Sequence, residues 1–225
     1  MEPGPVKTGV RPPQQARSRA ALQRLYASAQ HVLVNDGLGE FTIARVAEHA
    51  GVSVGGVYRR FASKEQLIDA VKDELAARLE DAVTKALDAA PPSLAGVVEA
   101  FVAALSETFS ENGRIIPAIL AGGHSPEPPV QGLRVATVMQ QRFLDAAAPY
   151  REQIRHRRPV TALTVVFRSV IATGTHRAAV NLWWPDGLTW QQWARETADM
   201  STAYLTGGHE SASAPGTEAC DGIAQ

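Results

Sequence analysis

The sequence contains almost no cysteine. Its single cysteine, Cys220, lies among small and polar residues close to the carboxyl terminus. One thiol cannot build a disulfide framework or a thiolate metal site, and its place in a polar tail of small residues gives little support to a cysteine nucleophile. We therefore expect a protein of a reducing compartment, the cytoplasm.

Long uncharged apolar runs are missing as well. Residues 159–176 come closest, but they contain Arg168 and are interrupted by threonines, Ser169 and Gly174. A membrane span needs roughly 18 uncharged apolar residues, so this stretch is better explained as a buried helix. The first residues carry charges and prolines without the apolar centre of a signal peptide. We expect neither a secretion signal nor a membrane partner.

The motifs of common enzymes are also absent. The chain has no G-x-S-x-G, no H-E-x-x-H and no C-x-x-C. Its "GVSVGG" stretch at residues 51–56 resembles a phosphate-binding loop, but it follows a helical pattern and no lysine comes after it. Glu152 and His156 have the i, i+4 spacing of two metal ligands, yet no third ligand is adjacent. We expect a protein that is not an enzyme and that uses no metal or cofactor.

Helical periodicity runs through the whole sequence. Apolar residues make up 45% of the chain, which is enough for a real core, and they recur at spacings of three and four rather than two. This pattern predicts an all-α protein. We expect helices at residues 17–34, 42–50, 53–61, 63–90, 93–111, 130–148, 159–181 and 189–206, with a short, broken helix and a loop at 114–129. Tyr26 and Phe61 are expected to face the core.

Hydroxyl residues and glycines mark the ends of several of these helices. Thr42 and Ser53 are expected N-caps, and Ser63 with Gln66 and Thr189 with Gln192 have the spacing of capping boxes. The glycines of "NDGLGE", residues 35–40, are expected to end the first helix.

Charge is distributed unevenly along the chain. Residues 1–61 contain eight Lys and Arg against four acids, a net charge of +4, whereas the remaining residues have a net charge of −5. A basic amino-terminal module on an acidic body is expected if only that end meets a polyanion.

Residues 42–61 have the layout of a helix-turn-helix, two short helices joined by a tight turn. Ala47 is small, as it must be where the second helix crosses the first. Gly51 allows the turn to leave the first helix with a positive φ, and Val52 and Val57 fill the angle between the helices. These residue types occur at the spacing that the motif requires.

Residues 42–71, "TIARVAEHAGVSVGGVYRRFASKEQLIDAV", resemble the amino-terminal signature of the TetR (tetracycline repressor) family of transcription regulators. The family pattern is roughly T-x-x-x-[IV]-A-x-x-A-G-V-S-x-G-x-[LV]-Y-x-[HRY]-F-x-[SN]-K-x-x-L, and nearly every fixed position is met. The remainder of the chain resembles the family only in architecture, as an all-α body of suitable length. The resemblance implies a DNA-binding regulator, more often a repressor, that a small-molecule effector releases from a palindromic operator.

These features divide the chain into four parts. We expect a disordered arm at residues 1–15, a three-helix DNA-binding domain at 16–62, a helical ligand-sensing and dimerisation domain at 63–206, and a disordered tail at 207–225. The composition of the two ends, rich in proline or in serine, alanine and glycine, favours disorder.

The resemblance implies three contacts to the phosphates of double-stranded DNA. Thr42 would cap its helix and touch a phosphate, Tyr58 would donate a hydrogen bond to one, and Lys64 would pair with one. Hydroxyls, helix N-termini and ammonium groups are the groups that position a protein on the DNA backbone without reading its sequence.

Other side chains are candidates for contacts in the groove. They are Ser53, Val54, Gly55, Arg59 and Arg60, with Arg45 from the preceding helix. A valine can contact a thymine methyl, and an arginine can bind O6 and N7 of guanine. We favour Arg59 over Arg60 as the base reader, because Arg60 lies nearer the end of the helix and could equally hold a phosphate.

A homodimer is expected because a single helix-turn-helix binds weakly and paired half-sites lie about 34 Å apart along DNA. The resemblance implies that the last two helices of each subunit form a four-helix interface. Small residues at positions 169 and 172–174 would let a partner helix approach closely. The expected contacts are Val166, Val170, Gly174, Trp190, Trp193, Thr197 and Met200. Alternatively, these helices complete the core of a monomer.

The middle helices are expected to enclose the effector. Candidate ligand contacts are Phe101, Leu105, Arg114, His124, Met139, Phe143 and His176, with ordinary core packing as the alternative for the apolar ones. A protein of this fold that binds a ligand or partner without regulated DNA binding is the alternative function. The presence of Thr42, Tyr58 and Lys64 favours the regulator.

Two adjacent glycines, Gly55 and Gly56, are unexpected in a helix, where each costs about 1 kcal/mol relative to alanine. Gly55 lies in the first turn after the Ser53 cap, where a backbone without Cβ can approach DNA closely. The sequence offers no comparable reason for Gly56.

Overall fold

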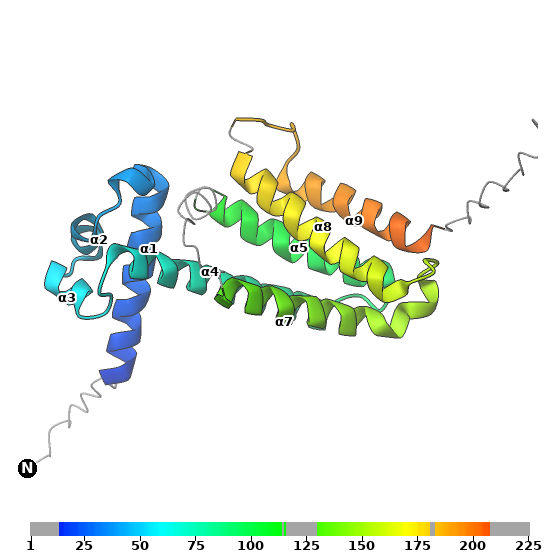
Figure 1. The fold of residues 1–225 in the computed structure, drawn as a ribbon, viewed down its shortest axis with the longest axis horizontal. Coiled ribbons are helices and arrows are strands. Elements are labelled where there is room, and N and C mark those ends of the chain that lie inside the picture. Colours follow the sequence, from blue (N-terminus) through cyan, green and yellow to red (C-terminus); the bar gives the residue numbers. More distant parts are fainter. Residues whose placement is uncertain (1–13, 114, 116–129, 181–182, 208–225) are drawn as a thin grey trace, which may run out of the picture.

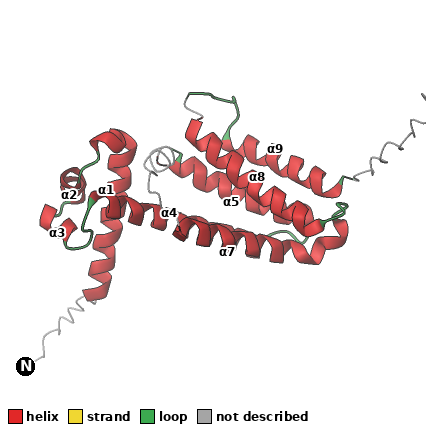
Figure 2. Ribbon diagram, in the orientation of Figure 1, coloured by secondary structure: helices red, strands yellow, loops and turns green. Residues whose placement is uncertain are grey.

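The computed structural model describes residues 14–113, 115, 130–180 and 183–207. In these ranges the chain is helical and contains no strand, which confirms the all-α prediction (Figure 1, Figure 2). The elements are α1 (Gln14–Glu40), α2 (Ile43–Ala50), α3 (Val54–Tyr58), α4 (Lys64–Asp88), α5 (Leu94–Asn112), α7 (Val130–Ala147), the 3-10 helix η1 (Ala148–Gln153), α8 (Pro159–Val180) and α9 (Trp190–Thr206).

The helices form two bodies that share α4. The first half of α4 packs against α1 and shares an apolar cluster with α1, α2 and α3, and its second half runs into a bundle with α5, α7, α8 and α9 (Figure 1). Each body has its own buried apolar cluster. Leu67 and Val71 of α4 belong to the first cluster, whereas Val83 and Leu87 belong to the second. The helix α4 is therefore a continuous link between the two cores.

Several helices begin at a hydroxyl cap, and of these only the cap at Ser93 was not predicted from the sequence. The hydroxyls of Thr42, Ser53, Ser63, Ser93 and Thr189 each accept a backbone N–H from the first turn of a helix. Such caps contribute roughly 1 kcal/mol each. The capping box of Thr189 and Gln192 is confirmed. At Ser63 the box differs by one residue, because the Gln66 side chain accepts its hydrogen bond from the N–H of Ala62.

The first helix consists of two helical segments. Helix α1 continues to Glu40, but Gly37 interrupts it with non-helical angles, φ 75° and ψ 173°. This positive φ is strained for any residue with a Cβ, so the glycine separates the two segments. The glycines of "NDGLGE", residues 35–40, therefore mark the end of the first segment, close to the predicted end at Val34, whereas the short second segment was not predicted.

Arg177 of α8 is a buried charge that fastens the turn between α8 and α9. Its guanidinium donates to both carboxylate oxygens of Asp186, at 2.7 and 3.1 Å, and to the carbonyl of Leu188 at 2.6 Å. It also stacks on the ring of Trp190, 4.2 Å from the centroid. The hydrogen bonds from Arg177 hold the pKa of Asp186 below its usual range, with help from the N–H of Leu188.

We expect Asp186→Asn to lower the free energy of unfolding by about 1–3 kcal/mol, because it leaves the guanidinium of Arg177, only 6% exposed, without its carboxylate. The contribution of Asp186 is present above its unfolded pKa of about 3.9 and is lost as pH falls through its lower folded pKa. Urea unfolding at decreasing pH should therefore show the gap between the two proteins closing. The control Asp81→Asn breaks an exposed pair with Lys85 and should change stability by less than about 0.5 kcal/mol. An equal loss in both variants would contradict this account.

Two structural features are absent from the described residues. None of their helices is long and apolar enough to cross a bilayer. Nor do three or more of their His, Cys, Asp and Glu side chains come together in a group that could hold a metal ion.

Candidate nucleic-acid interface

The segment from α2 to α3 is a helix-turn-helix. Gly51 caps α2 with φ 66° and ψ 35°, the left-handed conformation that the sequence predicted. The N–H of Val52 then donates to the carbonyl of Ala47 at 3.0 Å, which closes the turn. The hydroxyl of Ser53 accepts the N–H of Gly56 at 3.0 Å and starts α3. The turn is thus fixed by its own backbone hydrogen bonds and caps.

The inner side of this motif is packed tightly against α1 and α4. Val57 of α3 and Ala47 of α2 are fully buried, and they share a cluster with Phe41, Leu67 and Val71. A helix of only five residues would not be stable alone, since isolated helices of that length are marginal in water. The buried contacts therefore hold α3 in a fixed orientation.

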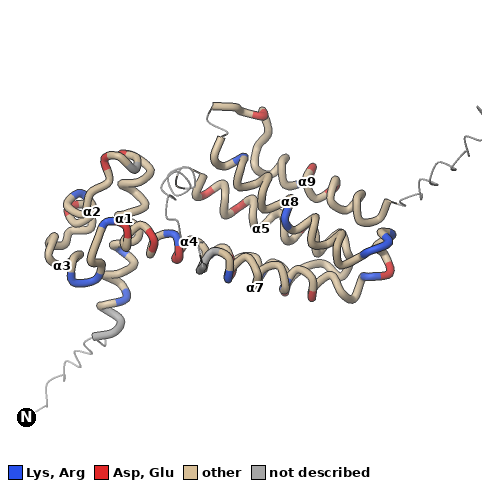
Figure 3. The backbone as a smooth tube through the Cα atoms, in the orientation of Figure 1, with Lys and Arg blue, Asp and Glu red and all other residues tan. Residues whose placement is uncertain are grey.

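The outer side of α3 carries exposed polar, basic and apolar side chains. Val54 is 42% exposed and Tyr58 is 52% exposed. Ser53, Gly55 and Arg59 are exposed on the same short segment. Figure 3 shows the basic stretch that follows α3 at the outer end of this body. Five of the predicted groove and phosphate contacts therefore lie together on one accessible surface.

The two arginines after α3 have different surroundings. The guanidinium of Arg60 donates to the backbone carbonyl and the hydroxyl of Ser18 in α1, at 3.3 and 3.4 Å. The guanidinium of Arg59 instead extends back along α3, with one nitrogen 3.6 Å from the position that a Cβ on Gly56 would take. Arg60 is therefore engaged with α1, whereas Arg59 stays on the outer surface of α3.

The structure reveals a role for Gly56 that was not apparent from the sequence. A Cβ at this position would lie 3.2 Å from the hydroxyl oxygen of Ser53, close enough to crowd the cap of α3, and near the guanidinium of Arg59. Gly55 has no neighbouring atom within 4 Å of its Cβ position, so only the approach of another molecule restricts its size. Gly56 therefore leaves room for the cap of α3, whereas Gly55 leaves the outer surface of α3 free for the approach of another molecule.

These surroundings predict opposite effects of Gly55→Ala on folding and on DNA binding. Alanine should stabilise the free protein by up to about 1 kcal/mol, because it costs less backbone entropy in a helix and meets no atom. The added Cβ would occupy the space between α3 and DNA, so duplex affinity should fall. Thermal unfolding and fluorescence anisotropy measure the two effects. Unchanged or tighter DNA binding would show that the backbone at Gly55 does not approach DNA.

The remaining predicted contacts lie at the border of this surface. Thr42 caps α2 through its hydroxyl, which accepts the N–H of Arg45 at 3.2 Å. The side chain of Arg45 forms an ion pair with Asp36 of α1 at 3.0 Å. The ammonium of Lys64, in the first turn of α4, lies 5.8 Å from the centroid of the Phe41 ring.

Tyr26 of α1 packs against the segment that follows α3. Its ring packs against Phe61 with the centroids 6.3 Å apart. Burial raises the pKa of the Tyr26 hydroxyl, and the carboxylates of Glu74 and Asp73 on α4 raise it further, although Arg60 opposes them. The hydroxyl therefore stays neutral between α1 and α4. Periodicity had predicted that Tyr26 faces the core, but nothing in the sequence indicated the Ser18 contact to Arg60.

A histidine pair at the contact of α1 and α2 was also not predicted. The rings of His31 and His49 are stacked with their centroids 4.1 Å apart, and Nδ1 of His49 lies 3.0 Å from the hydroxyl of Ser28. The two histidines are distant in sequence, so no local pattern could have indicated that they meet.

The predicted dimer contacts divide between the inside and the outside of the bundle. Val166, Val170, Gly174, Trp193 and Thr197 are buried by helices of their own chain, Trp190 is half-buried, and Met200 is exposed. The outer faces of α8 and α9 present Met200 together with side chains that were not predicted. The whole set, which we call the outer face of α8 and α9, is Val165, Ser169, Ala172, Thr173, Glu196, Met200 and Ala203.

The predicted ligand contacts are dispersed. Phe101, Leu105, Met139 and Phe143 are packed in the bundle core with at most 3% exposure. His176 lies at the carboxyl end of α8, where it lines a cavity of 290 Å³. Arg114 and His124 lie outside the described residues. The apolar candidates are thus part of the core of this structure.

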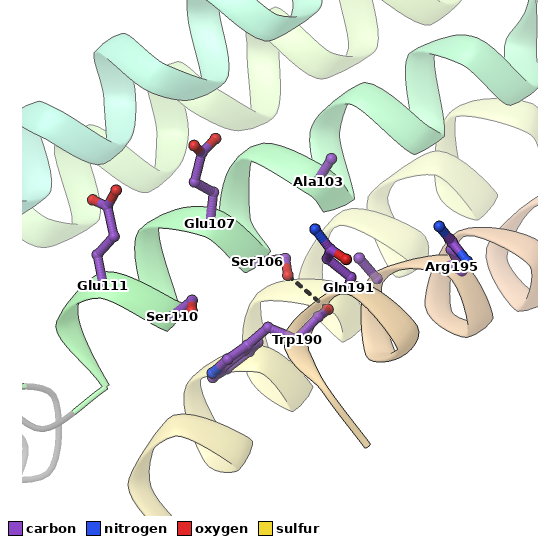
Figure 4. Close-up of a pocket in the computed structure, with 9 residues that line it drawn as sticks. Ala103, Ser106, Glu107, Ser110, Glu111, Trp190, Gln191 and Arg195 are labelled. Carbon is purple, nitrogen blue, oxygen red and sulfur yellow. Dashed lines mark hydrogen bonds between the residues drawn. The ribbon is translucent and has the colours of Figure 1, made fainter.

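Two cavities in the bundle were not predicted. One, of 600 Å³, lies between α5 and α9 and is lined by Glu107 and Glu111 on one side and by Trp190 and Arg195 on the other (Figure 4). The hydroxyl of Ser106 closes its base by donating to the carbonyl of Trp190 at 2.8 Å. The other, of 340 Å³, lies between α7 and α8. Their lining residues come from separate helices, so sequence spacing could not identify them.

A rigid helix-turn-helix with an accessible, partly basic outer helix, joined to a separate helical bundle, is the architecture of a DNA-binding regulatory protein. The short helix α3 has the position of the helix that enters the major groove in such proteins.

Comparison with known proteins agrees with this class. Residues 25–71 match the family described as bacterial regulatory proteins, tetR family. Among curated proteins, none matches the sequence. The solved structures of similar fold include the TetR family transcriptional regulator PfmR from Thermus thermophilus, at 19% identity and a TM-score of 0.60, covering 84% of this chain and 96% of that one.

Two other similar structures are regulators named FadR. One is the fatty acid degradation regulator from Bacillus halodurans, at 13% identity and a TM-score of 0.63, covering 81% of this chain and 93% of that one. The other is the transcriptional regulator from Bacillus subtilis in complex with stearoyl-CoA, at 11% identity and a TM-score of 0.62, covering 84% and 100%. The amino-terminal domain therefore belongs to the tetR family of bacterial regulatory proteins, and the whole chain has the fold of TetR family transcriptional regulators.

Proposed function

We propose that the protein is a repressor that binds a palindromic operator as a homodimer and is released by a small-molecule effector. The observation that carries this proposal is the outer surface of α3, where Val54, Tyr58 and Arg59 are accessible while Val57 holds the helix from below. In this proposal α3 enters the major groove, and Thr42, Tyr58 and Lys64 hold phosphates on either side of it.

The outer face of α8 and α9 supports the homodimer. Val165 is 44% exposed, and beside it Ser169, Ala172 and Thr173 form a strip of small side chains on α8. A partner helix can approach such a strip closely, and an exposed valine and the exposed Met200 would then be buried. We propose that two copies of the chain join through this surface. The interface is then formed by exposed residues of α8 and α9, most of which lie between the buried positions that the sequence suggested.

The shared helix α4 supports control by an effector. Because Leu67 and Val71 lie in one core and Val83 and Leu87 in the other, a shift of α4 in the bundle also moves the DNA-binding domain. An allosteric coupling of about 1–3 kcal/mol would change operator affinity roughly 5- to 150-fold. A fatty-acyl ligand is bound in the FadR structure from Bacillus subtilis. In our proposal the bundle of this chain likewise takes a small molecule.

Duplex binding by the full chain tests the proposal. A fluorescent pool of random duplexes should bind with an association constant whose logarithm falls linearly with the logarithm of salt concentration, since phosphate contacts release counterions. The double variant Tyr58→Phe, Lys64→Ala should bind less tightly and with a smaller salt slope, whereas Lys85→Ala, which removes an exposed lysine in the bundle half of α4, should match the original protein. An absence of duplex binding at low salt would overturn the proposal and favour a ligand-binding protein of the same fold.

A further inference from the structure

The connection between α7 and α8 concentrates positive charge at the end of the bundle opposite the DNA-binding domain (Figure 3). Residues 151–158 contain four exposed arginines, Arg151, Arg155, Arg157 and Arg158, against one acid. Within the described residues, none of these four guanidinium groups forms an ion pair or a hydrogen bond. The body of the protein is otherwise acidic, so this connection is a local site of uncompensated positive charge.

This connection is held in a fixed position. Ile154 is buried in the bundle core. The backbone N–H of Arg155 donates to the carbonyl of Leu205 at the end of α9, at 2.9 Å. The ring of His156 packs against Tyr204, with the centroids 5.7 Å apart. The arginines therefore extend from an anchored backbone, so binding of an anion to them would not carry the entropy cost of ordering a flexible loop.

The cavity of 340 Å³ between α7 and α8 opens beside these arginines. Its walls include the apolar side chains of Leu144, Ala147, Val160 and Leu163, and Arg151 also lines it. Gln141 lines it as well, but its amide donates to Asp145 at 2.8 Å. Arg151 is therefore the free charged donor at this cavity.

We propose that this cavity binds an amphipathic anion, a molecule with an alkyl or aromatic body and a carboxylate or phosphate head. The body lies between Leu144, Val160 and Leu163, where it is removed from water. The head pairs with Arg151, and guanidinium groups bind both carboxylates and phosphates in two parallel hydrogen bonds. The cavity volume is at the lower end of the roughly 300–1,000 Å³ that small-molecule sites occupy.

Binding of a ligand in this cavity can affect the DNA-binding domain through α7 and α4. The helix α7 packs along α4, and Arg134 of α7 forms an ion pair with Glu80 of α4 at 3.7 Å. A ligand that separates α7 from α8 would therefore shift α7 against the helix that links the two cores. This regulatory consequence rests on the proposed function, whereas binding to the cavity does not.

Calorimetric titration of the full chain without DNA tests the site. Sodium dodecanoate and dodecyl phosphate, each below its micelle concentration, should bind, whereas 1-dodecanol should bind at least about tenfold more weakly because it lacks the charged head. Shortening the alkyl chain should weaken binding by up to about fourfold for each methylene removed.

Two variants and a control locate the binding. Arg151→Gln and Val160→Asp should each weaken dodecanoate about tenfold, the first by removing the paired charge and the second by placing a carboxylate in the cavity. Both positions are exposed, and an acid in the first turn of α8 is favourable for a helix, so folding should be kept. Arg168→Gln, on the same helix but not lining the cavity, should leave dodecanoate affinity unchanged.

Several results would overturn the site. They are equal affinity for dodecanol and dodecanoate, unchanged affinity in both variants, and binding to phosphatidylglycerol vesicles without binding to monomeric dodecanoate. Dodecanoate binding by a protein that fails to bind duplex DNA would support the site and overturn only the proposed function.

Discussion

Val165→Glu should convert the proposed dimer into monomers and lower operator affinity by about 10²- to 10⁴-fold, the range that two linked binding sites gain over one. Val165 is 44% exposed on the outer face of α8 and α9, so the change should not disturb the protein's own core. In a symmetric interface each mutation occurs twice, and two carboxylates would be removed from water near one another. Light scattering after gel filtration reports the oligomeric state, and fluorescence anisotropy reports operator affinity.

Leu133→Glu is the matched control for this change. Leu133 is also a large exposed apolar residue, but it lies on α7, away from the outer face of α8 and α9. The Leu133 variant should remain dimeric and bind operator normally. A Val165 variant that stays dimeric would show that the two copies meet elsewhere, and a monomeric Val165 variant with full operator affinity would show that dimerisation is not needed for binding.

Arg59→Ala should relax sequence preference at particular base pairs, with a loss of about 1–3 kcal/mol on the preferred operator and little loss on operators changed at those positions. The guanidinium of Arg59 lies on the outer surface of α3, where it can reach a guanine edge. Affinities for the operator and for each of its single-base variants measure this effect.

Tyr58→Phe distinguishes a residue that reads the base sequence from one that positions the protein on the DNA backbone. It removes one hydroxyl from the same exposed surface and should weaken binding to all sequences by a similar factor, as expected for a phosphate contact. Arg60→Ala should likewise act uniformly, since Arg60 is bonded to Ser18 of α1. If Arg59→Ala leaves the sequence preference intact while Arg60→Ala changes it, the assignment of the base reader is wrong.

The sequence predicted those parts of the fold that depend on neighbours along the chain. Thr42, Ser53 and Ser63 cap their helices, and Gly51 takes the left-handed conformation, because caps and turns are formed by residues within three or four positions of one another. Helical periodicity also identified Val57 and Phe61 as buried. These local rules were sufficient to predict which residues of α3 form its outer surface.

The features that the sequence did not predict depend on contacts between distant segments. The tether from Arg60 to Ser18 joins residues 42 positions apart. Which side of α8 faces solvent was also undetermined, because that helix is apolar on most of its surface and periodicity alone assigns no inner side. For this reason residues such as Val166 and Val170 were expected at a dimer interface, although their own bundle buries them.

The cavities also depend on contacts between distant segments, so the sequence did not predict them. The site between α7 and α8 combines Leu144 and Arg151 with Val160, and only the packing of the two helices brings them together. The aromatic residues Phe101 and Phe143 were candidate ligand contacts, with core packing as the favoured alternative. In the structure their rings pack against each other with centroids 4.8 Å apart.

Selection of bound duplexes from a random pool by the full chain tests whether α3 reads DNA sequence. We expect enrichment of a palindrome whose half-sites are centred about one turn of DNA apart, or a multiple of that spacing, and loss of preference at defined positions in the Arg59→Ala protein. Enrichment of no common sequence, at low salt and with the folded protein, would contradict the assignment of α3 as a DNA-reading helix.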